Sequence, residues 1–408
     1  MKALVLAGGL PQIKLTNDLK ERGIEVVLAD GNAKPLAYGY ADIFYQVNIF
    51  DVEAVKDIAV KEKVDFLITC CADQVLLVVA QISEMLGLPW YIDYNTAKQV
   101  SDKELMKEMF VECGIPTSKH VVMKSFDSSL LKDLNYPLIV KPVDSYSSRG
   151  VRKVVDEHSL RKAFEEALAI SRTSGVIVEE LCLGEEISVD VFVTDGKAKL
   201  LCVSNSEKIK SEDRFVIFRG KWPVNISEEV YTKIEIVAQQ IADGFKIKNA
   251  PMLIQLISDG KDISVLEFCA RTGGAMKYIL INRSCGVDVI DAVIDLSLGL
   301  EPDTTMKPPK AKYIVNDFIY CNAGEFDHLE GFQELVDSGV LAEYHPLRPK
   351  GFIFSGSANS SGDRAAGMTI QADSKEEFNE KYKVILDKIK VIDKDGKDII
   401  RKELLRGI

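Results

Sequence analysis

Strand-like and helix-like segments alternate through residues 1–94, and this alternation restricts the fold more than any other feature of the sequence. Neighbouring parallel strands need a crossover connection, which is usually a helix. The alternation therefore predicts a doubly wound parallel sheet at the start of the chain. The predicted strands cover residues 3–7, 26–30, 43–47 and 66–69. Three helices are predicted between and after them: one ends at Glu21, one begins after the cap Asp51, and one covers residues 74–86.

The first turn of this unit does not have the pattern of a dinucleotide-binding site. Gly8 and Gly9 lack the G-x-G-x-x-G spacing, and Pro11 stands where the phosphate-facing turn would continue. Asp30 ends the second strand, as a ribose-binding acid would, but without the glycine pattern it does not predict a nicotinamide or flavin cofactor. The helix after Gly9 still offers a substrate the amide groups at its N-terminus.

A second unit begins near Asn95, and a helix opened by a capping box at residues 101–104 follows. Residues 139–151 then combine an apolar strand that carries Lys141, a loop of small residues and a return strand. A lysine in an apolar strand is costly to bury unless an anion meets it, and the hydroxyls and amides of the loop suit phosphate oxygens. The segment alone fits a hairpin with a surface lysine equally well.

Two later strands, residues 252–257 and 263–268, each carry one polar side chain among apolar ones. These are Gln255 and Glu267, and the strands are joined by a turn at Asp259 and Gly260. On antiparallel partners joined by a short turn, this spacing can place the two side chains together on one face. Cys269, Arg271 and two glycines follow directly.

A third unit lies beyond a proline-containing linker over residues 302–309. It has predicted strands over residues 313–320 and 365–371, and a capping box at residues 374–377 opens a predicted helix to about residue 390. The three units together predict a multidomain protein of the α/β and α+β classes, with boundaries at residues 1–94, 95–305 and 306–408.

The charge and composition exclude several classes of function. The formal net charge of −11 argues against general binding to nucleic acid or to an anionic membrane, since both need a basic face. Eight scattered cysteines and four distant histidines give neither a disulfide framework nor a zinc-ligand spacing. No stretch resembles a signal peptide or a membrane helix, so we expect a cytoplasmic protein.

Three motifs in this order resemble those of the ATP-grasp superfamily. They are Ile139-Val-Lys-Pro with Ser147-Ser-Arg-Gly-Val, then Val178-Glu-Glu-Leu with Gly184-Glu-Glu, then Leu266-Glu-Phe-Cys-Ala-Arg-Thr-Gly-Gly. The resemblance covers most of the chain. It implies a Rossmann-like pre-ATP-grasp domain at residues 1–94, an ATP-grasp domain at 95–305 with a mobile lid at about 117–184, and a C-terminal α+β domain at 306–408.

The resemblance implies a nucleotide site made by the second unit. Lys103 and Lys141 would hold the α- and β-phosphates, since their point charges on flexible stems suit that role. Ser147, Ser148 and Gly150 would belong to a flap, residues 145–150, over the phosphates.

The same resemblance assigns the base and the ribose. Glu179 would accept a hydrogen bond from the adenine amine, and the backbone at Glu180 and Leu181 would contact the edge of the ring. Glu186 would bind the ribose hydroxyls. From the residues alone, Glu179 also fits an ordinary acid at a strand end, and Lys103 fits a solvated helix turn.

The implied metal and substrate residues follow. Gln255 and Glu267 would bind Mg²⁺ or Mn²⁺ between the β- and γ-phosphates, and Arg271 would face the transferred phosphoryl group and the substrate carboxylate. Gly273, Gly274 and Arg364 are further candidate substrate contacts. Arg271 also fits a structural ion pair, and Arg364 a surface turn. Lys141, Glu267 and Arg271 would thus be the catalytic residues.

Two positions depart from the common pattern. The first metal position is usually an acid and here is Gln255, although glutamine occurs there in the carbamoyl phosphate synthetase branch. The position two after Glu267 is usually asparagine, a further metal ligand, and here is Cys269, whose thiol is a poor partner for Mg²⁺.

The implied activity is an ATP-dependent carboxylate–amine ligase that works through an acylphosphate and releases ADP and phosphate. The layout is also similar to phosphoribosylglycinamide synthetase, to bicarbonate-phosphorylating carboxylases and to amino-acid ligases. An ATP-binding protein without ligase turnover is the alternative from another class. We expect small-molecule carboxylate and amine substrates, no nucleic-acid or membrane partner, and either a monomer or a homodimer.

Overall fold

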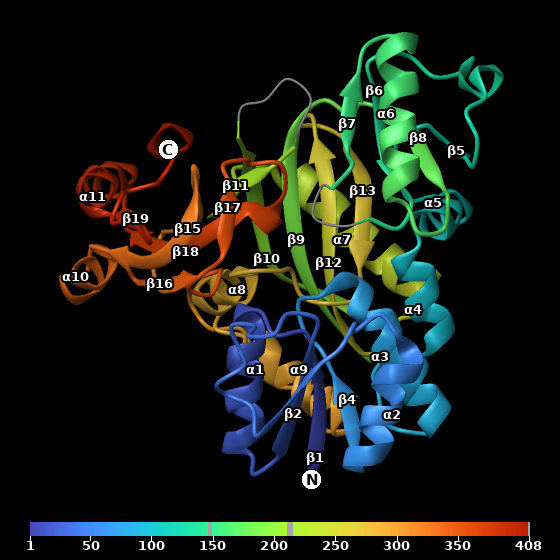
Figure 1. Cartoon of the computed structure of the whole chain (residues 1–408). Helices are drawn as coiled ribbons and strands as arrows, with labels where there is room; N and C mark the ends of the chain where they lie inside the picture. Colours follow the sequence, from blue (N-terminus) through green and yellow to red (C-terminus); the bar gives the residue numbers. More distant parts are fainter. Residues whose placement is uncertain (146–148, 210–214, 407–408) are drawn as a thin grey trace.

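The computed structural model describes residues 1–145, 149–209 and 215–406, which form four sheets with helices packed around them (Figure 1). The N-terminal sheet is parallel, with strand order β3-β2-β1-β4. Two of its strands, β1 (Lys2–Leu6) and β2 (Glu25–Asp30), are buried over most of their length, as strands covered on both faces should be. The other elements are β3 (Ile43–Gln46), β4 (Phe66–Ile68), α1 (Leu10–Glu21), α2 (Val52–Glu62), α3 (Asp73–Leu86) and α4 (Tyr94–Ser101).

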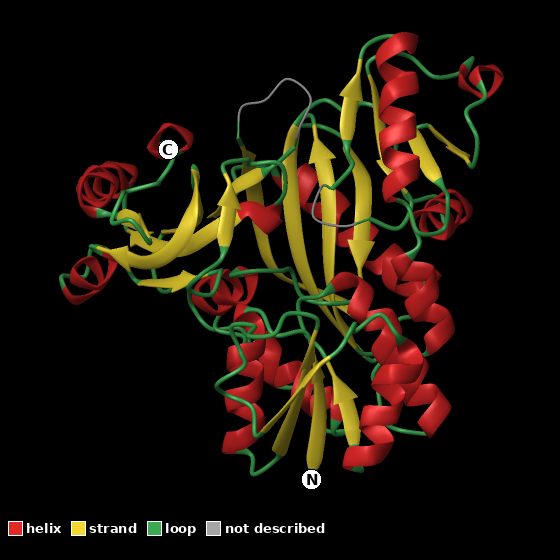
Figure 2. Cartoon of the chain, in the orientation of Figure 1, coloured by secondary structure: helices red, strands yellow, loops and turns green. Residues whose placement is uncertain are grey.

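A second, antiparallel sheet has the order β5-β8-β6-β7 and lies within the range predicted to be the lid. One helix covers it in Figure 2 and buries Leu160, Ala163, Phe164 and Ala167 at helical spacing. The elements are α5 (Lys103–Glu112), β5 (His120–Met123), η1 (Ser128–Leu131), β6 (Leu138–Pro142), β7 (Arg152–Val154), α6 (Glu157–Ile170) and β8 (Val176–Glu180).

The largest sheet has eight strands in the order β13-β12-β9-β10-β11-β14-β18-β16. It joins strands from both sides of the predicted boundary at residue 305, because β11 pairs with β14 in an antiparallel register. The elements are β9 (Glu185–Thr194), β10 (Lys197–Lys208), β11 (Ile217–Trp222), α7 (Glu228–Gly244), β12 (Ala250–Ser258), β13 (Ile263–Cys269), α8 (Lys277–Cys285), α9 (Val289–Ser297), β14 (Tyr313–Tyr320), β16 (Glu343–Pro346) and β18 (Arg364–Ala372).

A small antiparallel sheet, β17-β15-β19, completes the C-terminal part. Its elements and the remaining helices are β15 (Ala323–Glu330), α10 (Phe332–Asp337), β17 (Ile353–Ser355), η2 (Ser361–Asp363), α11 (Lys375–Lys388), β19 (Lys390–Asp393) and η3 (Lys402–Leu404). The mixed α/β and α+β architecture predicted from the sequence is therefore confirmed, whereas the exact domain boundaries stay predictions.

One predicted cap is wrong. Ser101 is the last residue of α4, so it does not open the next helix. Asp102 is the cap of α5 instead, and its carboxylate accepts hydrogen bonds from the amides of Glu104 and Leu105. A carboxylate satisfies these free amides and also favours the positive end of the helix dipole.

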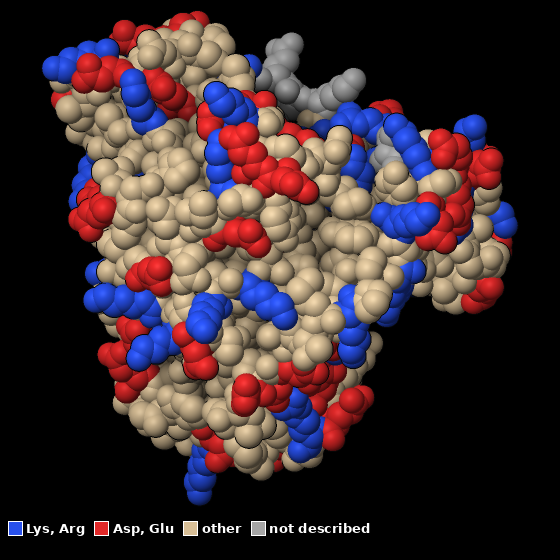
Figure 3. Space-filling view, turned by 180° about the vertical axis from the view of Figure 1, so that it is seen from behind, with Lys and Arg blue, Asp and Glu red and all other residues tan. Residues whose placement is uncertain are grey.

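The surface carries both signs of charge. On the face shown in Figure 3, Lys and Arg side chains are interspersed with Asp and Glu. Among the described residues, no helix combines the length and the apolar composition that crossing a lipid bilayer requires.

Candidate active site

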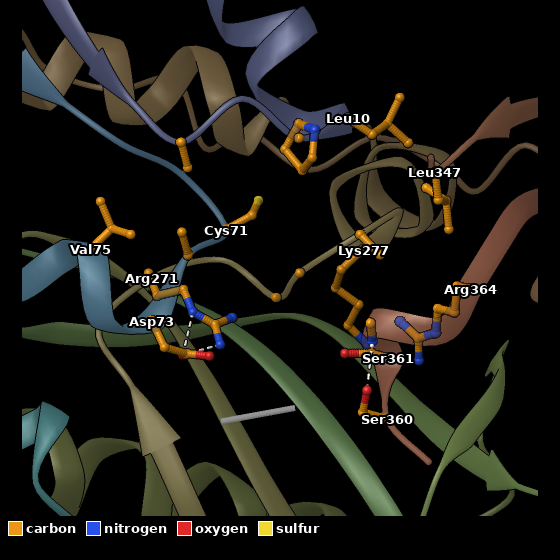
Figure 4. Close-up of a pocket in the computed structure, with 18 of the residues that line it drawn as sticks. Leu10, Cys71, Asp73, Val75, Arg271, Lys277, Leu347, Ser360, Ser361 and Arg364 are labelled. Atoms are coloured by element: carbon orange, nitrogen blue, oxygen red, sulfur yellow. Dashed lines mark hydrogen bonds and ion pairs between the residues drawn. The ribbon is translucent and has the colours of Figure 1, made fainter. Parts of the chain in front are cut away.

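A cleft of about 910 Å³ lies where the N-terminal sheet, the eight-stranded sheet and the C-terminal loops meet; we call it the central cleft (Figure 4). Seven of the predicted site residues line it, and they come from α5, β12, β13, the loop after β13 and β18. These are Lys103, Gln255, Glu267, Arg271, Gly273, Gly274 and Arg364. Lys141, Gly150, Glu179, Glu180, Leu181 and Glu186 are not among the lining residues, and Ser147 and Ser148 lie outside the described residues.

The two polar strand residues meet as their spacing predicts. Gln255 on β12 stands directly opposite Glu267 on β13 in the antiparallel register, with an irregularity just after Gln255. Directly opposed residues in such a pair have side chains on the same face. Two oxygen donors are thus brought together at the wall of the cleft.

Lys103 connects this pair to the flap. Its ammonium lies 3.2 Å from a carboxylate oxygen of Glu267 and donates a hydrogen bond of 2.6 Å to the carbonyl oxygen of Ser145. Burial alone would lower the pKa of Lys103, but the Glu267 carboxylate more than offsets this and raises it. Lys103 is therefore a fixed positive charge beside the flap, and the solvated-turn interpretation is wrong.

The donor set suits a hard cation. Mg²⁺ prefers oxygen ligands and usually keeps several waters, needing one or two protein carboxylates plus substrate phosphates. One amide and one carboxylate from Gln255 and Glu267 fit that requirement. Within the described residues, no three His, Cys, Asp or Glu side chains gather as a complete metal site. Burial raises the pKa of the Cys269 thiol well above its ordinary value, so it stays protonated and makes a poor third ligand.

Lys141 and Glu179, which both lie on strands of the lid sheet, form a buried cluster with Lys107 of α5. Glu179 is 3% exposed, and its two oxygens lie 2.5 Å from the Lys141 ammonium and 3.0 Å from that of Lys107. Ser118 donates a third contact of 2.7 Å to the same carboxylate. Burial favours the neutral acid, but the two lysines reverse this and lower the pKa of Glu179 to about 2.

This cluster changes the interpretation of two residues. The Lys141 side chain is buried rather than at the surface of a hairpin, so the surface interpretation is wrong. Lys107 is 1% exposed and was missed in the sequence, although it lies four residues after Lys103 and thus on the same face of α5. The predicted adenine contact of Glu179 stays a prediction, made by a carboxylate that already has three partners.

The other predicted base and ribose contacts also have partners. The amides of Glu180 and Leu181 donate to the carbonyl oxygens of Lys119 and Pro137, so those two donors are engaged in this arrangement. Glu186 forms an ion pair with Lys208 on β10 and lies 3.5 Å from the Gln255 amide nitrogen. These contacts place Glu186 next to Gln255, one of the two residues predicted to bind the metal.

Arg271, four residues after Glu267, is held by the N-terminal unit. Its guanidinium donates through Nε and Nη2 to one oxygen of Asp73, the first residue of α3, with 2.6 Å for the Nε contact (Figure 4). It also donates through Nη1 to the Thr272 carbonyl oxygen at 2.7 Å. The ion-pair interpretation is thus correct for this arrangement, and Arg271 lines the cleft as well.

The glycines after Arg271 are required by close packing at one position. A Cβ at Gly273 would come within 2.6 Å of Cγ of Lys277, which also lines the cleft. Lys277 lies 3.0 Å from Asp190 and donates to the Ser204 hydroxyl at 2.6 Å. The pairing of Lys277 with Asp190 joins residues far apart in the chain, and no local sequence pattern predicts it.

Arg364 is 9% exposed and lines the cleft, so the surface-turn interpretation is wrong. Its Nε donates to the Tyr320 hydroxyl at 3.2 Å and its Nη2 to the Ile217 carbonyl oxygen at 2.9 Å. Gly150, at the end of the flap, has a φ of +78°, which a glycine adopts without strain.

Comparison with known proteins agrees with this arrangement. Residues 134–278 match the family model described as the ATP-grasp domain. The chain is 23% identical over 290 residues to the carbamoyl phosphate synthase large chain of Clostridium acetobutylicum, covering 69% of this chain and 26% of that one. It is 29% identical over 179 residues to D-alanine–D-alanine ligase of Geobacillus thermodenitrificans, covering 39% and 48%. The chain thus spans between a quarter and a half of these two relatives.

Solved structures share the whole fold. Phosphoribosylglycinamide synthetase from Anaerococcus prevotii superposes with a TM-score of 0.76 at 19% identity, covering 96% of this chain and 99% of that one. L-amino acid ligase from Bacillus licheniformis gives a TM-score of 0.80 at 18% identity, covering 96% and 98%. Residues 134–278 thus form an ATP-grasp domain, and the whole chain has the fold of these solved structures.

Proposed function

We propose that this protein is an ATP-dependent carboxylate–amine ligase that forms an acylphosphate and releases ADP and phosphate. The observation that carries the proposal is the in-register pair Gln255 and Glu267, with Lys103 3.2 Å from Glu267, in the same cleft as Arg271. Phosphoryl transfer needs charge neutralisation and alignment more than covalent help from the protein. A cleft with metal-type oxygens, a fixed lysine and an arginine supplies both.

In this proposal, different residues of the cleft bind the metal, the phosphates and the acylphosphate. Gln255 and Glu267 would hold Mg²⁺ or Mn²⁺, which would supply positive charge against the phosphates of ATP. Lys103 and Lys141 bind the phosphates, which replace Glu267 and Glu179 as their nearest anions. Arg271 exchanges Asp73 for the developing acylphosphate, because its planar fork matches a carboxylate or phosphate.

The lid residues act when ATP is bound. Glu179, Glu180 and Leu181 at the end of the lid, together with Glu186 on β9, would contact the adenosine, although they do not line the cleft in the present arrangement. Their approach requires the lid to rotate toward the cleft, and such closure also excludes water from the acylphosphate. An amine then attacks the acylphosphate carbon, forms the amide and displaces phosphate.

The test is acylphosphate trapping with hydroxylamine beside ADP release, over a panel of carboxylates, for the wild type and Glu267→Gln. We expect Glu267→Gln to lower kcat at least about 100-fold, as removal of a charge-stabilising group does. The matched control is Asp262→Asn, because Asp262 lies on the same hairpin with a side chain that is 68% exposed. It should leave kcat within about twofold, since exposed charges contribute little.

Two outcomes would overturn the proposal. Equal kcat values for Glu267→Gln and Asp262→Asn would remove Glu267 from the reaction. Tight ATP binding without hydroxamate from any carboxylate would instead identify an ATP-binding protein without ligase turnover, the alternative that Cys269 favours by weakening a second metal site.

A further inference from the structure

Two arginines on the C-terminal wall of the central cleft have no acidic partner. The buried or half-buried cations elsewhere in the cleft are paired: Lys103 with Glu267, Arg271 with Asp73, and Lys277 with Asp190. Within the described residues, neither Arg348 nor Arg364 has a carboxylate within ion-pair distance, yet both line the cleft. A buried charge without a counter-ion is unfavourable unless something else compensates it.

Both guanidinium groups are held rigidly over aromatic rings. The Arg364 guanidinium carbon lies 3.7 Å from the centre of the Phe318 ring, and that of Arg348 lies 4.9 Å from the Phe352 ring. Both rings also line the cleft. Such stacking fixes the plane of the group and shields it from water, which strengthens its attraction for an anion.

Their remaining donors are incompletely used. Arg348 donates through Nη2 to the Gly362 carbonyl oxygen, but its Nε is buried without a hydrogen-bond partner among the described residues. Arg364 uses Nε and Nη2 for Tyr320 and Ile217. A buried donor without a partner costs the full desolvation penalty, so Arg348 can still gain from a further acceptor.

The nearest acid does not fill this role. Asp363 acts electrostatically on Arg348, but its Oδ2 accepts hydrogen bonds from the amides of Asn359 and Ser360 and thereby shapes the loop. Burial lowers the pKa of Arg348, and the charge of Arg364 lowers it further, so the two arginines lie close enough to repel. An anion between them would relieve that repulsion.

The cleft as a whole favours anions, although the chain is acidic. Among the described residues that line it, seven are Lys or Arg and three are Asp or Glu. Figure 4 places Arg364 and Ser361 on the opposite side of the cleft from Arg271 and Asp73. One ligand could therefore present one anionic group at each side.

We propose that Arg348 and Arg364 form a second anion subsite that binds a distal oxyanion, a carboxylate or a phosphate monoester, of the substrate whose reacting carboxylate faces Arg271. The substrate class is then a dianion rather than a simple monocarboxylate. This choice of substrate rests on the ligase proposal, whereas binding of an oxyanion by the two arginines does not. Bidentate arginine donors suit both kinds of oxyanion.

Binding without ATP tests the subsite directly. Calorimetric titrations would use two ligands that carry a carboxylate and a distal oxyanion, glutarate and 3-phosphoglycerate, and, as the monoanion matched to glutarate, pentanoate. The proteins are the wild type, Arg348→Gln and the control Lys350→Gln, whose side chain is 74% exposed and paired with Asp327. We expect the wild type to bind at least one dianion about tenfold more tightly than pentanoate, and Arg348→Gln alone to remove that preference. The better dianion identifies carboxylate or phosphate as the distal group.

A second variant provides an independent test of the subsite, with its folding checked. Arg364→Lys keeps the charge but loses the planar fork, and its melting curve shows whether it folds. If it folds, its dianion preference should fall as well. Equal binding of dianions and pentanoate by the wild type, or an equal loss in Arg348→Gln and Lys350→Gln, would overturn the subsite.

Turnover measurements distinguish failure of the anion subsite from failure of the ligase proposal. ADP release with glutarate and pentanoate should show about a tenfold rise in KM for the dianion in Arg348→Gln, with kcat nearly unchanged, because the distal group contributes uniform binding. Dianion binding without ADP release would leave the subsite standing and reject the ligase. Turnover of pentanoate and glutarate with equal KM, unaffected by Arg348→Gln, would reject the subsite and leave the ligase proposal standing.

Discussion

At the scale of single residues, Glu179 is the most tightly compensated acid of the site. Its pKa is lowered to about 2 although burial opposes ionisation, because Lys141 and Lys107 lie within 3.0 Å. A group whose folded pKa is depressed contributes stability above its unfolded pKa and loses it as the pH falls through the folded value. For Glu179 that loss runs from the ordinary pKa of about 4.5 down to about 2.

Glu179→Gln should therefore lower the free energy of unfolding at pH 7 by roughly 3 kcal/mol, since it leaves two buried lysines without a counter-charge. It should also flatten the dependence of stability on pH between about 4.5 and about 2. Urea unfolding at several pH values measures both effects. Glu180→Gln is the matched control, because Glu180 is the next residue and, within the part of the chain that the structure describes, its carboxylate accepts from Asn135 alone. A pH profile for Glu179→Gln that matches the wild type would contradict this assignment.

At the scale of elements, the hairpin β12–β13 shows which contacts the sequence predicts well. Gln255 and Glu267 are twelve residues apart on strands joined by a tight turn, so alternation and register bring them together. The sequence could not show that Gln255 lies 3.5 Å from Glu186, because that contact depends on the pairing of β12 with β9, a strand far back in the chain.

This contact makes Gln255→Glu informative. A carboxylate at this position would stand beside Glu186 and Glu267, so repulsion should lower the melting temperature without metal by a few degrees. MgADP should restore most of the lost melting temperature, because the added carboxylate also strengthens metal binding. Melting curves with and without MgADP measure this, with Gln240→Glu on α7 as a control away from the cleft. A metal-independent shift would argue against a metal at this hairpin.

At the scale of the whole molecule, the contacts that define the cleft join residues far apart in the chain. Patterns within one segment predicted the strands, the motifs and the parallel N-terminal sheet. They could not predict that β11 pairs with β14, that Asp73 holds Arg271 across 198 positions, or that Arg348 and Arg364 converge. Each of these depends on how the units pack, and local propensity carries no information about that packing.

The pair of Asp73 and Arg271 is the clearest of these long-range links, and Asp73→Asn tests it. Burial raises the pKa of Asp73, but Arg271 outweighs this and lowers it, so both groups are charged at neutral pH. Asparagine keeps an acceptor oxygen but removes the charge, so the buried guanidinium loses its counter-ion and retains the Thr272 carbonyl oxygen as a neutral partner. We expect a loss of roughly 3 kcal/mol in the free energy of unfolding. The matched variant Glu84→Gln removes an exposed acid from the same helix and should change stability by less than about 0.5 kcal/mol.

Added substrate should distinguish a purely structural pair from a shared one. If the substrate anion takes the place of Asp73 at Arg271, a carboxylate with MgATP should stabilise Asp73→Asn more than it stabilises the wild type, because it restores a missing counter-charge. Thermal melts with and without these ligands provide the comparison. Equal stabilisation of both proteins would mean that Arg271 stays bound to Asp73 throughout, and its role at the reacting carboxylate would then have to pass to another cation of the cleft.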